Sequence, residues 1–157
     1  MITNKTTQRI GHEPVHILLV GNNPIELSSM QAVVQKLPGK KVMTEIAFDL
    51  NSIWNRLMKF RPSLILIDDN IGAAQLGQTI QRLSADPKTK DVPIAVLKNS
   101  NYSSVVMNEV NDYVLKQNLK PETIYSILKH VMQFKQARTY LTRTYNKRKR
   151  QLLKLMR

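Results

Sequence analysis

Short apolar runs and longer amphipathic stretches alternate along this chain and predict its elements. Several of the runs, such as residues 64–67, contain no polar alternation, which is typical of strands covered on both faces. Between the runs, apolar residues recur with the spacing of one helix face. The expected strands are residues 15–20, 42–48, 64–67, 94–97 and 112–116, and the expected helices are residues 25–37, 50–60, 73–85, 102–109 and a last one beginning at residue 121.

Regular alternation of strand and helix implies right-handed crossovers and an α/β fold. We therefore expect a five-stranded, doubly wound parallel sheet. In open sheets of this kind, ligand sites collect at the carboxyl ends of the strands. Asp68 and Asp69 directly follow the third expected strand. An isolated aspartate often does no more than end a strand, so the residues at the other strand ends decide whether a site is present.

Composition narrows the class of protein. The 157 residues are enough for one domain with a hydrophobic core, and there is no cysteine for a disulfide framework. No apolar run approaches the roughly 20 residues that a membrane span needs. Residues 1–14 lack the apolar core of a signal peptide, and we expect them to form a flexible N-terminal arm. These features predict a cytoplasmic protein with no membrane span.

The positive charge is concentrated at the end of the chain. Residues 135–157 contain nine lysines and arginines and no acid, and they account for most of the net charge of +13. A basic tail favours an acidic partner, nucleic acid or a membrane surface, although it is also compatible with a merely solvated helix.

The last helix also carries an apolar seam. From Ile127, every fourth and then third residue is apolar at seven of nine positions, which is a coiled-coil pattern that predicts a homodimer or a partner helix. Arginines occupy the other two positions and weaken the seam, so a frayed basic tail is the alternative. The nine positions are Ile127, Val131, Phe134, Arg138, Leu141, Tyr145, Arg148, Leu152 and Leu155.

Four segments, in order, resemble the receiver domain of bacterial two-component response regulators. They are residues 17–20 before a helix opened by proline, residues 64–68, residues 83–94 and residues 112–116. The resemblance spans about residues 15–135 and leaves residues 136–157 as a basic C-terminal helical extension.

The resemblance implies a flavodoxin-like fold with strand order 2-1-3-4-5, followed by an extended C-terminal helix. Asp68 falls on the family's phosphoacceptor, and Lys116 falls on the lysine that contacts the phosphoryl group. Asn70 and Tyr113 belong to the same expected pocket. A histidine kinase or an output protein is the implied partner.

The sequence departs from the family where the family holds its metal ion. Gly21 and Asn22 stand in place of the acidic pair that binds Mg²⁺, and Gln117 replaces the proline that usually follows the lysine. Mg²⁺ prefers carboxylate ligands, and Asp68 with the Asn70 carbonyl oxygen makes a poor set. We therefore expect a degenerate receiver, or pseudo-receiver, with no metal site and no cofactor, while Mg²⁺ remains the doubtful exception.

Lys98 replaces the threonine or serine that bonds the phosphoryl oxygen in the family. Two placements are open: beside Asp68, where its charge would lower the pKa of the carboxylate, or outward into solvent. Ser100 is a less favoured source of the missing hydroxyl. Asp69 follows Asp68 directly and is expected to point to the opposite side.

Three functions follow from these features. The first is a signalling module of a phosphorelay that acts through protein–protein contacts with impaired phosphorylation of Asp68. The second is a phospho-accepting response regulator with a metal site rebuilt from other residues, and the third is a nucleic-acid-binding protein that uses the basic tail. No Ser-His-Asp or Cys-His arrangement can be argued from the sequence, and the histidines show no metal-ligand grouping, so we expect no enzyme. A flavin-binding flavodoxin is disfavoured because residues 21–24 offer no hydroxyl for a phosphate.

Overall fold

The computed structural model describes residues 14–37, 39, 41–99 and 107–156. The chain divides into two compact units, with the boundary between Tyr125 and Ser126. The expected N-terminal arm, apart from its last residue, lies outside the described residues, and so does Ser100. Most of the helix expected at residues 102–109 also lies outside them, and its described end, residues 107–109, forms a turn instead of a helix.

Five parallel strands form one sheet with the order β2-β1-β3-β4-β5. This order confirms the predicted doubly wound, flavodoxin-like fold. The parallel register places Val20 opposite Ile67 and Asp68 opposite Leu97, so the carboxyl ends of the strands meet at one edge. The strands are β1 (Val15–Val20), β2 (Val42–Ala47), β3 (Leu64–Asp68), β4 (Ile94–Lys98) and β5 (Asp112–Leu115).

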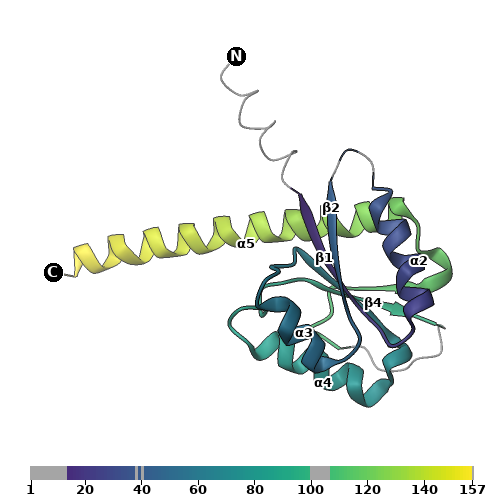
Figure 1. Cartoon of the computed structure of the whole chain (residues 1–157). Coiled ribbons are helices and arrows are strands. Elements are labelled where there is room, and N and C mark those ends of the chain that lie inside the picture. Colours follow the sequence, from purple (N-terminus) through teal and green to yellow (C-terminus); the bar gives the residue numbers. More distant parts are fainter. Residues whose placement is uncertain (1–13, 38, 40, 100–106, 157) are drawn as a thin grey trace. The chain divides into compact units, whose positions relative to one another are not determined.

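Helices cover both faces of the sheet. In Figure 1, α2 lies on one side of the strands, and α3 and α4 lie on the other. Polar residues fix two of the helix starts, because the Asn23 side chain caps α2 and the Asp49 side chain caps α3. The α-helices are α2 (Pro24–Gln35), α3 (Leu50–Leu57), α4 (Ala73–Ala85) and α5 (Pro121–Leu155), and two short 3₁₀ helices are η1 (Asp69–Ile71) and η2 (Lys116–Asn118).

The core explains why the central strands, such as β1 and β3, show little polar alternation. Successive residues of β1 point to opposite faces, and both faces are buried. Leu18 packs in one cluster with Ile53 of α3 and Ile80 of α4, while Ile17 and Leu19 are fully buried as well. All positions of β1 except His16 are therefore buried, as the apolar runs predicted.

The last helix is continuous over 35 residues, because no glycine or proline interrupts it after its first residue. The predicted extended C-terminal helix is confirmed. No helix in the described part of the chain is long and apolar enough to cross a membrane. The exposed large apolar side chains near the end of α5 are those of Tyr140, Leu141, Tyr145, Leu152, Leu153 and Leu155.

Candidate functional site

The candidate site lies at the carboxyl edge of the sheet. Asp68 is the last residue of β3, and its side chain is fully buried. Lys116 directly follows β5, at the start of η2. Because parallel strands end at the same edge, the fold brings these two residues together although 48 positions separate them in the sequence.

Lys116 lies between two carboxylates. Its Nζ atom is 2.5 Å from Oδ2 of Asp68 and 2.7 Å from Oε2 of Glu26. The lysine side chain is 20% exposed and that of Glu26 is 42% exposed, so this group of charges runs from the interior to the surface. The Lys116 ammonium group therefore balances the charge of the buried Asp68 carboxylate. The Glu26 carboxylate in turn holds this ammonium group in place.

Two asparagines connect this ion pair to the neighbouring loops. The side-chain nitrogen of Asn70 donates to Oε2 of Glu26 over 2.8 Å, and its backbone N–H donates to Oδ1 of Asp68 over 3.1 Å. The side-chain nitrogen of Asn22 donates to the carbonyl oxygen of Asn70 over 2.9 Å. The loop after β1 and the loop after β3 are thus tied to each other by hydrogen bonds.

The environment shifts the pKa of each ionisable group in the site. Burial raises the pKa of Asp68, and the hydrogen bond from Lys116 opposes that shift. The hydrogen bond from Lys116 lowers the pKa of Glu26 below its usual value. Burial alone would lower the pKa of Lys116, but its hydrogen bonds to Asp68 and Glu26 outweigh burial and raise it. Lys116 therefore stays charged throughout the neutral range.

Glu26 is the residue of the candidate site that the sequence analysis missed. It lies in the first turn of α2, where the cap by Asn23 and the position of Pro24 fix the start of the helix. A weak signal was available, because Glu26 is the first acid after β1 and begins a helix at the carboxyl edge of the sheet. Its contact with Lys116, 90 residues away, depends on the reach of two long side chains, which no spacing rule encodes.

Gly21 occupies a closely packed position beside Asp68. A Cβ atom at Gly21 would lie 3.0 Å from Cδ2 of Leu27 and 3.4 Å from Cβ of Asp68. Any larger residue there would require the Leu27 side chain to shift. Glycine at the first position of the family's acidic pair is therefore matched to the packing around Asp68.

The remaining residues of the expected pocket lie on the β4 and β5 side. Nζ of Lys98 is 5.3 Å from the centroid of the Tyr113 ring, a cation–π arrangement. The Tyr113 hydroxyl accepts a hydrogen bond from the backbone N–H of Met107. The Asp69 carboxylate accepts hydrogen bonds from the backbone N–H and the side-chain nitrogen of Asn99. It therefore binds the start of the loop that follows β4.

Mg²⁺, which the family resemblance implies, does not fit the residues present. Oδ2 of Asp68 faces the Lys116 ammonium, and Oε2 of Glu26 accepts from two donors. The carbonyl oxygen of Asn70 accepts a hydrogen bond from Asn22, which supplies no carboxylate. Within the described ranges, no group of three or more His, Cys, Asp or Glu side chains is placed to hold a metal ion. The positive charge next to Asp68 comes from the Lys116 ammonium group.

Comparison with known proteins identifies the fold. No protein-family model and no curated protein sequence matches the chain. The magnesium-bound receiver domain of the sensor histidine kinase PA1611 from Pseudomonas aeruginosa is 20% identical, with a TM-score of 0.62 over 75% of this chain and 97% of that one.

Two further solved structures agree with this assignment. The Mn²⁺-bound response regulator Rcp1 is 25% identical, with a TM-score of 0.56 over 75% of this chain and 89% of that one. The chemotaxis response regulator CheY4 of Vibrio cholerae is 19% identical, with a TM-score of 0.60 over 76% of this chain and 99% of that one. The resemblance found in the sequence is confirmed at the level of structure: this chain has the fold of a response-regulator receiver domain.

Proposed function

We propose that this chain is a receiver-like signalling domain of a two-component phosphorelay in which Mg²⁺-dependent phosphorylation of Asp68 is impaired. The observation that carries the proposal is the position of Lys116 Nζ between Asp68 and Glu26. The charge of the aspartate is balanced by groups of the chain itself. Its signalling would then depend on contacts with other proteins, such as a histidine kinase or an output protein.

The chemistry of phosphorylation supports the proposal. An aspartate that attacks a phosphoryl group brings two negatively charged groups together, so the site must supply extra positive charge. Here Glu26 adds a second carboxylate to the edge of the pocket, and the two carboxylates share one ammonium. An incoming phosphoryl group therefore meets Asp68 in a pocket with no surplus positive charge from these three residues.

The apolar seam of the last helix supports an assembly role. Leu141, Tyr145, Leu152 and Leu155 recur with coiled-coil spacing and are all more than half exposed. A homodimer would remove these side chains from water. We propose that the helix joins two copies of the chain and that residues 15–135 form the signalling domain of each copy.

Treatment with a small phosphodonor in Mg²⁺, followed by intact-mass spectrometry, tests the proposal. The wild-type chain should show no stoichiometric phosphoryl adduct, and Asp68→Asn should give the same spectrum. Glu26→Gln removes the competing carboxylate and should raise any trace of labelling. A stoichiometric adduct that disappears in Asp68→Asn would instead support a phospho-accepting response regulator.

A further inference from the structure

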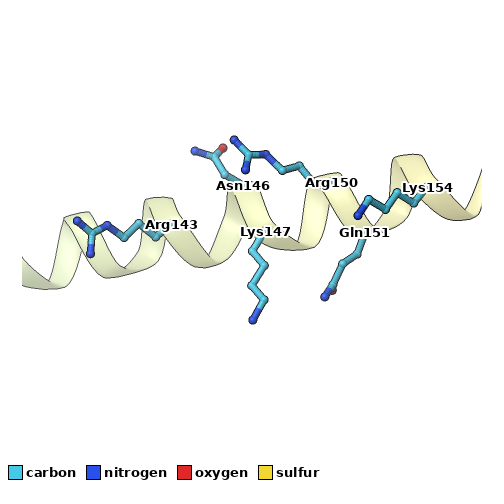
Figure 2. A pocket seen from close by; sticks show the side chains of 6 residues that line it. All are labelled: Arg143, Asn146, Lys147, Arg150, Gln151 and Lys154. Carbon is cyan, nitrogen blue, oxygen red and sulfur yellow. The ribbon is translucent and has the colours of Figure 1, made fainter.

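A stripe of positive charge runs along one face of α5. Arginine and lysine recur there with a spacing of four, three and four residues, so the four side chains lie one turn above another. Residues 126–157 contain no aspartate or glutamate. Figure 2 shows the side chains of these cations on the helix, together with those of an asparagine and a glutamine: Arg143, Asn146, Lys147, Arg150, Gln151 and Lys154.

The stripe lies on a different side of the helix from the apolar seam. With 3.6 residues per turn, its centre is about 150° around the helix axis from the centre of the seam residues Leu141, Tyr145, Leu152 and Leu155. The four cations are exposed, as are the four apolar side chains. The two faces are therefore able to bind different partners at the same time.

We infer that the cationic stripe, defined as Arg143, Lys147, Arg150 and Lys154, binds the phosphate backbone of duplex nucleic acid. Charge complementarity carries the inference, because the stripe places roughly one cation every 5 Å along a straight helix. Duplex DNA is also a straight, regularly charged molecule, with about one negative charge per 1.7 Å of its axis. Amide side chains such as Asn146 and Gln151 also donate to phosphate oxygens.

The arrangement of the two faces argues against an anionic membrane. A helix that lies in a membrane interface buries its apolar face, and its cations reach the lipid phosphates from the sides of that face. Insertion of the seam would direct the stripe away from the headgroups. A second copy of the chain is also a poor partner for the stripe, because its corresponding face carries the same charge. This inference does not depend on the chemistry of Asp68.

Binding of the full chain to a short fluorescein-labelled DNA duplex of mixed sequence tests the inference, with fluorescence anisotropy measured across a range of salt concentrations. Four phosphate contacts predict a slope of log affinity against log salt of about −3.6 per bound chain. The variant R143Q/K147Q/R150Q/K154Q should lose about a hundredfold in affinity and most of this slope. Glutamine keeps the helix propensity, and circular dichroism checks that the helix is retained.

Two control variants make the result specific. K59Q/K88Q/K90Q/K120Q removes the same number of exposed charges from residues outside α5 and should bind nearly as well as the wild type. R143K/K147R/R150K/K154R keeps the charge and should retain binding. Equal losses in both glutamine variants would overturn the inference. So would the absence of duplex binding at low salt, or binding to phosphatidylserine vesicles in place of the duplex.

Discussion

The pocket around Asp68 and the basic end of α5 use lysine in opposite ways. In the pocket, Lys116 is fixed between Asp68 and Glu26. In residues 126–157, lysines such as Lys147 are exposed on a segment that contains no acid. In the first arrangement the charges balance one another inside the chain, whereas the second leaves a surplus of positive charge on the helix.

The difference also sets how each region should respond to mutation. A buried carboxylate that loses its cation leaves an uncompensated charge in the interior, which is strongly destabilising. Exposed cations contribute little to stability, so their removal should leave the fold intact. The role of the pocket can therefore be tested by measuring the free energy of unfolding of variants. The role of the basic end of α5 can be tested by measuring how variants associate with a partner.

The largest expected effect comes from Lys116→Met. This change leaves Asp68 buried without its cation, and we expect it to lower the free energy of unfolding by about 3 kcal/mol, measured by urea denaturation. The exposed Lys120→Met is the matched control and should change stability little. The double variant Lys116→Met/Asp68→Asn should recover much of the loss. A single variant as stable as the control would show that the ion pair is not what satisfies Asp68.

A smaller effect is expected from Arg148→Leu, which removes one of the two arginines that interrupt the apolar seam. The substitution removes a like-charge contact between paired helices and adds apolar surface, so the homodimer should tighten about tenfold, or about 1.4 kcal/mol. Sedimentation velocity measures this change. Arg143→Leu, on the opposite face, is the control and should not tighten the dimer. A chain that stays monomeric in both variants, at low and at high salt, would remove the coiled-coil interpretation.

The Lys116 ion pair should also give a specific dependence of stability on pH. The pKa of Lys116 is raised in the folded chain, so its contribution is fully present below the ordinary lysine pKa. The contribution is lost as the pH rises through the higher folded value. In alkaline solution, the unfolding free energy of the wild type should therefore fall more steeply than that of Lys116→Met. Parallel curves from thermal or urea unfolding across that range would contradict the assignment.

The sequence predicted the sheet well because the signals for buried strands are local. The apolar run at residues 64–67 needed no distant information to be identified as a covered strand. The ends of β3 and β5 then placed Asp68 and Lys116 at one edge, because parallel strands share it. The continuity of α5 was equally local, since it follows from the lack of glycine and proline.

The details of the site were harder to predict because they depend on side-chain reach across the fold. Glu26 contacts Lys116 because two long side chains reach across the carboxyl edge of the sheet, where β3 and β4 lie between β1 and β5. The position of Lys98 beside the Tyr113 ring depends on two neighbouring strands, whereas the sequence analysis considered only a placement beside Asp68 or one in solvent. The turn at residues 107–109 replaced an expected helix end, since short amphipathic segments carry weak periodicity.

The smallest effect should come from Glu26→Gln, and it tests whether Glu26 holds the ion pair in place. Glutamine keeps the size of the side chain and an oxygen acceptor for Asn70, but it removes the charge that faces Lys116. The pKa of Lys116 should therefore fall toward the ordinary value, since one of the two carboxylates that raise it is gone. NMR titration of the lysine side-chain carbons measures this shift directly. Glu122→Gln, in the first turn of α5, is the matched control and should leave the Lys116 titration unchanged. An unchanged titration in Glu26→Gln would mean that Asp68 alone fixes the lysine, and it would remove Glu26 from the proposed block on phosphorylation.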